Sequence, residues 1–286
     1  MDRANEFAAN RPALFGLAYR MLGMRADAED VVQEAFLRWQ QAKPEEIRSP
    51  RSYLMTVAAR LSLDALKAAH RKRETYFGEW LAEPVVTETP DQTLEKAESL
   101  SLAFLYLLET LSPAERVAFL MREIFDESYE EVALMLETSE GNSRQLVARA
   151  RKHLQQRQPR FAVDRPRHEA VLHRFLTACS SGDTAALFSL IKEDAILHGD
   201  GGGKAPAVVN PIYGADKIVR LMLGLVRKQP AELQGGYMTA INGQPGFVFT
   251  LGDQVASVLT LDLNEDGLIQ AIYVVANPEK LRLTVI

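Results

Sequence analysis

The stretch NSRQLVARARKHL, residues 142–154, gathers basic side chains and contains no acidic residue, although Asp and Glu outnumber Lys and Arg in the whole chain, 38 to 33. Apolar residues recur in it at helical spacing, so the basic side chains should share the opposite, exposed face of a helix. Lys and Arg neutralise phosphates, and Arg and Gln can read base edges. The stretch therefore predicts a nucleic-acid contact made by Arg144, Gln145, Arg149, Arg151 and Lys152.

The residues before this stretch predict a partner helix. SYEE at 128–131 is a capping box, in which Ser128 accepts from the backbone and Glu131 reaches back. A short turn, ETSEG, separates this helix from the basic one. Two short helices joined by a tight turn have the layout of a helix-turn-helix, whose second helix enters the major groove. A helix hairpin with a solvated basic face fits the same stretch equally well.

The rest of the first half predicts further helices. In residues 27–40 the apolar positions follow a helical period, which buries Val31, Val32, Ala35, Phe36 and Trp39 and leaves a polar face outside. Ser49 and Pro50 suit the start of another helix, and SPAE at 112–115 is a second capping box. Residues 74–99 hold two prolines and an excess of acid, which is typical of a linker, although Trp80 and Leu81 are too apolar for a passive one.

From about residue 168 the pattern is helix first and strand later. HEAVLHRFLTACSSGD, TAALFSLI and GADKIVRLMLGLVRK have helical patterns, whereas AILHGDGGGK reads as a strand that ends in a glycine loop. GYMTAING, GFVFTLG, QVASVLTLDL and LIQAIYVVA alternate as strands do, and NEDG is a hairpin turn signal. An α+β domain is predicted here.

Composition excludes several classes of protein. The single cysteine, Cys179, rules out an internal disulfide and fits a reducing compartment. The chain begins without the apolar stretch of a signal peptide, and no apolar run approaches the ~20 residues of a membrane span. We therefore expect a cytoplasmic protein that makes no membrane contact. The five histidines show no metal-ligand spacing, and DGGGK lacks the Ser or Thr and the glycine spacing of a phosphate loop, so we expect no metal and no cofactor.

Three segments carry a family resemblance. DAEDVVQEAFLRW, SPRSYLMTVAARLSLD and LSPAERVAFLMREIFDESYEEVALMLETSEGNSRQLVARARKHL, in this order, resemble a bacterial RNA polymerase sigma factor of the extracytoplasmic-function (ECF) type. The first two are similar to its domain 2 and the third to its domain 4. The resemblance implies that core RNA polymerase, through its β′ coiled coil and β flap, and promoter DNA are the partners.

The same resemblance assigns the surfaces. It makes the basic helix the reader of the −35 promoter element. Polymerase binding falls on the outward residues of the helix at 27–40, which are Asp30, Gln33, Glu34 and Arg38. Contact with the −10 element falls on Arg60, Lys67, Arg71, Lys72 and Arg73. Taken alone, the polymerase-binding set and the −10 set could each equally be the ordinary solvent-exposed face of a helix.

The C-terminal pattern resembles a SnoaL-like cone domain. WLAEP, DGGGK and NPEKL look like signatures of ECF sigma factors fused to such a domain, although Ala82 stands where a proline is more typical. This resemblance implies a domain that regulates the sigma domains by contacting them or their linker. We expect the contact to involve Trp80, Leu81, Glu83, Pro84, Asp200, Lys204, Asn277 and Lys280, with Glu83 paired to Lys204 or Lys280.

These observations define a multidomain fold: two all-α sigma domains, the second with the helix-turn-helix, and a C-terminal α+β SnoaL-like cone. The expected boundaries are 1–75 for domain 2, 76–100 for the linker, 101–160 for domain 4 and 166–286 for the cone. We expect a sigma factor without chemistry of its own.

Two rival functions stay open. One is a DNA-binding regulator that does not engage polymerase. The other is a cone that binds or transforms a small molecule, for which the acid–base candidates are His198, Asp200, Tyr213, Tyr237 and Asp262.

Overall fold

The computed structural model describes residues 3–43, 47, 49–73, 75–87, 100–155, 164–228 and 235–283, apart from the side chains of residues 70–72, 155 and 228. The chain divides into two compact units. The first, here the helical unit, comprises Met1–Thr75, Asp91–Ser99 and Leu105–Gln158. The second, the sheet unit, comprises Tyr76–Pro90, Leu100–Phe104 and Pro159–Ile286. The expected helix-to-strand order along the chain is confirmed.

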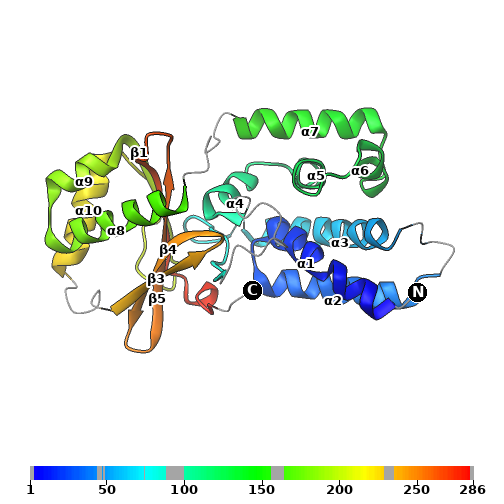
Figure 1. Ribbon diagram of the computed structural model, residues 1–286, viewed down its shortest axis with the longest axis horizontal. Coiled ribbons are helices and arrows are strands. Elements are labelled where there is room, and N and C mark those ends of the chain that lie inside the picture. The colour runs from blue at the N-terminus through cyan, green and yellow to red at the C-terminus, as the bar shows by residue number, and fades with distance from the viewer. Residues whose placement is uncertain are drawn as a thin grey trace. The chain divides into compact units, whose positions relative to one another are not determined.

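The helical unit begins with three helices that lie side by side (Figure 1). Trp39 is fully buried among them, and its ring packs against Tyr53, with ring centroids 5.7 Å apart. Phe36 lies at the margin of this core against Phe7, at 4.9 Å. The apolar stripe expected in residues 27–40 thus faces inward. The three helices are α1 (Arg3–Leu22), α2 (Arg25–Gln41) and α3 (Pro50–Arg73).

The second part of the helical unit contains the helix-turn-helix. Both predicted capping boxes form, at Ser112 with Glu115 and at Ser128 with Glu131. Glu137, with a φ of 51°, makes the turn before the last helix. The elements are the part of α4 (Leu102–Leu108) from Leu105 onward, α5 (Pro113–Phe119), a π-helical turn (Leu120–Ile124), α6 (Tyr129–Met135) and α7 (Glu140–Gln155).

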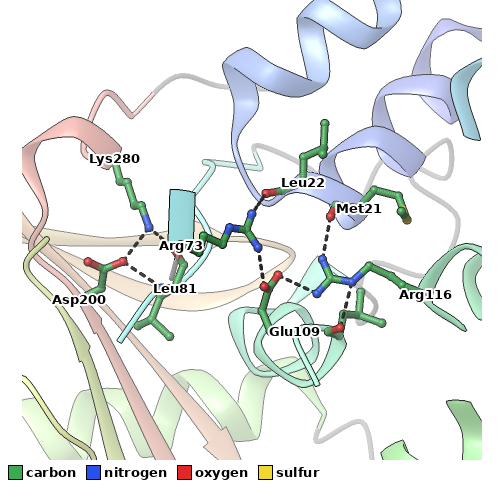
Figure 2. A network of polar contacts seen from close by, with 9 residues as sticks. Met21, Leu22, Arg73, Leu81, Glu109, Arg116, Asp200 and Lys280 are labelled. Carbon is green, nitrogen blue, oxygen red and sulfur yellow. Dashed lines mark hydrogen bonds and ion pairs between the residues drawn. The ribbon is translucent and has the colours of Figure 1, made fainter. Parts of the chain in front are cut away.

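A buried charge network joins the two parts of the helical unit (Figure 2). The fully buried Arg116 donates to the carbonyls of Met21, at 2.7 Å, and Leu108, at 2.9 Å, and to Glu109, at 2.7 Å. Arg73 donates to the same carboxylate. Burial alone would raise the pKa of Glu109, but the two arginines outweigh it and hold that pKa below its usual value. The network fixes α5 against the end of α1.

The sheet unit has three helices on one side of a mixed sheet (Figure 1). The strand order is β2-β1-β6-β5-β4-β3; β1 and β6 run parallel and the other neighbours antiparallel. Its elements are α8 (Arg165–Ser181), α9 (Thr184–Leu190), β1 (Ile191–Asp200), β2 (Ile212–Tyr213), α10 (Ala215–Lys228), β3 (Gly235–Ile241), β4 (Gln244–Leu251), β5 (Gln254–Leu263) and β6 (Ile269–Val275).

The two faces of this sheet pack against different elements, and the alternation of side chains along each strand sends neighbouring residues to opposite faces. Leu259 and Leu261 of β5 join the apolar core under the helices. Val258 points the other way and packs in a smaller cluster that includes Val86 from the linker. Thr87 donates from its backbone to the carbonyl of Ala240 at 3.0 Å, which ties the linker to the end of β3. Residues 76–87, expected as part of a linker, are therefore built into the sheet unit.

Candidate functional site

The basic helix is α7, and its exposed face carries the predicted DNA-contacting residues. Its apolar side, Leu146, Val147, Ala150 and Leu154, is buried. The five predicted side chains, Arg144, Gln145, Arg149, Arg151 and Lys152, are all exposed. Helical spacing puts Gln145 and Lys152 near the middle of the exposed face. It puts Arg149 on one flank, and Arg144 and Arg151 on the other.

Each flanking arginine has an acidic neighbour within the helical unit. The Nε of Arg149 lies 3.4 Å from the Oε1 of Glu115. Arg151 donates to Glu123 at 2.7 Å, and Arg144 donates to Glu140 at 2.5 Å. The Arg144 guanidinium also lies over the Tyr129 ring, 4.3 Å from its centroid. Sequence reasoning did not identify Glu115 and Glu123 as partners of these arginines, because both lie on elements that precede α7 and no local pattern connects them to it.

The predicted polymerase-binding residues share one side of α2. Asp30, Gln33 and Arg38 are exposed, and Glu34 is half-buried and pairs with Arg38 at 2.9 Å. Leu37 lies among them with 48% of its surface exposed. Sequence reasoning did not name Leu37, because a single leucine outside the apolar stripe of a helix is common on protein surfaces and does not by itself indicate a partner.

Of the predicted −10 residues, the three whose side chains the structure describes, Arg60, Lys67 and Arg73, do not form one free basic surface. Lys67 is exposed. Arg60 donates to the carbonyls of Leu134, at 2.8 Å, and Met135, at 3.2 Å, and thereby caps the end of α6. Arg73 belongs to the buried network around Glu109. The side chains of Arg71 and Lys72 lie outside the described residues.

The signature motifs of the linker and the C-terminal domain meet in a buried cluster, here called the linker site: Tyr76, Leu81, Asp200, Asn277 and Lys280. Figure 2 shows Leu81, Asp200 and Lys280 of this cluster. One oxygen of the fully buried Asp200 accepts from Lys280 at 2.7 Å and from the backbone N–H of Leu81 at 2.9 Å. The other accepts from the Tyr76 hydroxyl at 2.5 Å. Lys280 also donates to the carbonyl of Leu81 at 2.6 Å.

Aromatic rings and an amide complete the linker site. The Lys280 ammonium lies 4.1 Å from the centroid of the half-buried Trp80 ring, a cation–π contact. Asn277 donates to the Tyr76 hydroxyl at 2.7 Å. Burial and the Asp200 carboxylate raise the pKa of Tyr76 above its usual value. Tyr76 was not among the predicted residues, because it precedes the WLAEP motif.

The remaining predicted contacts lie near the linker site. Glu83 and Pro84 are buried. Lys204 pairs with Glu279 at the surface, and Lys280 pairs with Asp200. The expected pairing of Glu83 with Lys204 or Lys280 stays a prediction.

The acid–base candidates of the sheet unit do not meet in one pocket. His198 is buried, and its Nδ1 lies 3.0 Å from Glu79 of the linker. Burial raises the pKa of Asp262 to about 6, and this carboxylate accepts from Gln270 at 3.0 Å. Tyr213 and Tyr237 are 61% and 49% exposed. In the part of the chain that the structure describes, no three His, Cys, Asp or Glu side chains are placed to hold a metal ion.

Comparison with known proteins decides the family. Residues 7–72 match the family model "Sigma-70 region 2", and residues 101–154 match "Sigma-70, region 4". The ECF RNA polymerase sigma factor SigJ of Mycobacterium tuberculosis is 40% identical over 96% of this chain and 92% of its own length. The chain belongs to the ECF RNA polymerase sigma factors. The probable ECF sigma factor SigI of the same species is 32% identical, with the same coverage.

The likeness to SigJ extends through the C-terminal domain. The crystal structure of M. tuberculosis SigJ matches this sigma factor with a TM-score of 0.80 and 37% identity over 97% of both chains. As a sigma factor, the chain binds core RNA polymerase and directs it to promoter DNA. Across the described ranges, none of the helices is both long and apolar enough to span a membrane.

Proposed function

We propose that this sigma factor initiates transcription through three surfaces and is regulated by its own C-terminal domain. The polar side of α2, with Leu37, docks on the β′ coiled coil. The basic end of α3 meets the −10 element, and α7 reads the −35 element while domain 4 contacts the β flap. The exposed row of Gln145, Arg149 and Lys152 supports the reading role, because these side chains reach outward from a helix whose other side is buried.

The linker site is the observation that carries the regulatory part of the proposal. The linker determines how far apart domains 2 and 4 can lie, and in the described structure residues 76–87 belong to the sheet unit. The buried Asp200–Lys280 pair also bonds to Tyr76 and Leu81 of the linker, which favours one docked position because releasing the linker would leave the buried charges without these partners. The C-terminal domain therefore controls sigma activity by holding or releasing the linker.

Arg60 and Arg73 support regulation through a closed form of the helical unit. Both are assigned to the −10 element, and both donate to groups of the same unit: Arg60 to the end of α6 and Arg73 to Glu109. Arg73 is 12% exposed and donates from both terminal nitrogens, to Glu109 and to the carbonyl of Leu22, so it cannot keep these partners and bind a DNA phosphate at once. Arg60 is 44% exposed, and its bonds to α6 hold its guanidinium against domain 4. Promoter binding then requires that domain 4 be released from α3, a step that a freed linker would permit.

In this proposal the C-terminal domain catalyses no reaction. The sheet face under the helices is filled mainly by aliphatic side chains, among them Leu197, Leu259, Leu261 and Ile272. Among the buried polar groups of the sheet unit, His198 contacts Glu79 of the linker, Asp200 accepts from Tyr76 and Leu81 of the linker, and Asp262 accepts from Gln270. A protein that acts on chromosomal DNA with polymerase works in the cytoplasm of a bacterium, which is where we place it.

The proposal is tested by transcription in vitro. Core polymerase from the host and the full-length chain first identify a promoter in a genomic library. Wild type, Trp80→Ala and a chain without residues 168–286 are then compared on that promoter. We expect a partial change for Trp80→Ala and a large one for the truncation. If the truncated and full-length proteins initiate equally, the C-terminal domain is not a regulator of this sigma factor.

A further inference from the structure

The two capping boxes of domain 4 are alike in sequence and local geometry but differ in what else their glutamates contact. In each, a glutamate accepts from the N–H of the capping serine, at 3.1 Å for Glu115 and 3.0 Å for Glu131. Glu131 then accepts from the hydroxyl of Ser52 on α3 at 3.1 Å. In Glu115 the other carboxylate oxygen, Oε1, instead lies 3.4 Å from Arg149 on α7, here called the reading helix.

We propose that Glu115 is a positioning residue for promoter recognition, which orients the guanidinium of Arg149 toward the bases of the −35 element. This inference rests on the proposed reading role of α7. Glu115 is well placed for the task because it is itself held. Its side chain is 9% exposed, and its Oε2 accepts from both the N–H and the hydroxyl of Ser112, at 3.1 and 2.8 Å. A carboxylate so fixed cannot follow a mobile arginine, so the arginine must adapt to it.

The geometry leaves Arg149 able to read a base. Glu115 approaches the guanidinium from the Nε side, at 3.4 Å, and the Arg149 side chain is 56% exposed. The two terminal nitrogens, with four N–H donors, stay available for the O6 and N7 of a guanine. An arginine held by one edge loses less conformational freedom on binding, which favours a specific base contact over a loose phosphate contact.

The charge of Glu115 adds a second effect. It lies next to the surface that DNA approaches, and His153, one turn after Arg149, also places its Nδ1 within 3.8 Å of the carboxylate. A negative charge there opposes binding to any DNA, whatever its sequence. Glu115 thus raises affinity for the correct sequence through Arg149 and lowers affinity for all others. Its removal should move specific and non-specific binding in opposite directions.

The test uses Glu115→Gln, with Glu131→Gln as the matched control. Glutamine also serves in a capping box, so both variants keep their helix starts, and thermal unfolding verifies this. Holoenzyme made with host core polymerase is titrated with two duplexes: one selected by the wild type from a pool randomised at −35, and a shuffled version. We expect the ratio of the two affinities to fall about tenfold in Glu115→Gln, with tighter binding to the shuffled duplex. We expect the ratio to stay unchanged in Glu131→Gln.

Arg149→Ala separates failure of this inference from failure of the reading role. If the wild type selects no sequence, or if Arg149→Ala discriminates as well as the wild type, α7 does not read the −35 element through Arg149. The proposed reading role of α7 and the positioning role of Glu115 would then both be wrong. If Arg149→Ala loses discrimination while Glu115→Gln keeps all of it, only the role of Glu115 is overturned. The double variant should discriminate no worse than Arg149→Ala alone, because Glu115 acts through that arginine. An additional loss would show that Glu115 acts elsewhere.

Discussion

The linker site and the reading helix use charge in opposite ways. At the linker site, Asp200 and Lys280 are removed from water, and backbone and side-chain groups take up their hydrogen-bonding positions. On α7, the arginines are held from one side and stay about half exposed. A buried pair fixes one arrangement because every alternative is costly, whereas an exposed pair contributes little energy and leaves its charge for a partner. The first suits a regulatory contact and the second suits recognition.

The largest effect should come from removing one member of the buried pair. Lys280→Met leaves Asp200 buried without its cation, which should cost about 3–5 kcal/mol of stability in the sheet unit. Lys204→Met, at the exposed pair with Glu279, should leave the stability of the sheet unit nearly unchanged. Hydrogen exchange in peptides that cover residues 76–87 and 191–200 measures both. The double variant Asp200→Asn with Lys280→Met should recover part of the lost stability. Equal hydrogen exchange in Lys280→Met and Lys204→Met would show that the buried and the exposed pair contribute alike, which would contradict this prediction.

The sequence predicted these two regions to different degrees. Both capping boxes, the start of α3 at Pro50 and the exposed face of α7 follow from contacts within a few residues, which local pattern captures. The linker site does not, because Leu81 and Tyr76 reach Asp200 across 119 and 124 residues of chain. The motifs indicated that these segments meet, but the pairing of Lys280 with Asp200 depends on how the strands and the linker are placed in three dimensions. Likewise, the period of α7 shows which arginines are outside but not that Glu115 and Glu123 hold them.

On the reading helix, the contrast is between a held arginine and a lysine at the centre of the exposed face. Arg149→Ala should cost about 1–3 kcal/mol on the preferred promoter and relax specificity at one position. Lys152→Ala should weaken binding to all sequences and lower the salt slope by about one unit. Binding to matched and shuffled duplexes over a range of salt concentrations distinguishes them. If both variants keep wild-type binding, the exposed face of α7 is a solvated surface.

Glu127 and Glu131 of the helical unit form a carboxyl pair that is less buried than the linker site and whose protonation changes near neutral pH. Burial, together with Glu131, raises the pKa of Glu127 to about 7, and Arg51 of α3 lies 3.8 Å from its carboxylate. Since this folded-state pKa lies above the unfolded value, the stability from protonated Glu127 is complete below about pH 4.5 and is lost as the pH rises through about 7. The loss should be on the order of 1–2 kcal/mol. Glu127→Gln should unfold at nearly the same denaturant concentration as wild type at pH 4 and at a higher one at pH 8; parallel pH profiles would contradict this.

The smallest change in stability should accompany a large change in binding, on α2. Asp30 is exposed, so Asp30→Lys should alter the stability of the helical unit by no more than about 0.5 kcal/mol. Glu34→Lys should cost slightly more, because it also loses the pair with Arg38, worth about 0.3–0.5 kcal/mol. Both should weaken holoenzyme formation, since a reversed charge faces the same partner in each. The control is Asp64→Lys on α3, which is also exposed but lies outside the proposed docking surface. The measurement is holoenzyme formation with host core polymerase. A decrease for Asp30→Lys and Glu34→Lys but not for Asp64→Lys would show that the exposed charges of α2 determine polymerase binding. The buried residues of α2 would then serve only the fold. Equal binding by all three would place the polymerase contact on another surface.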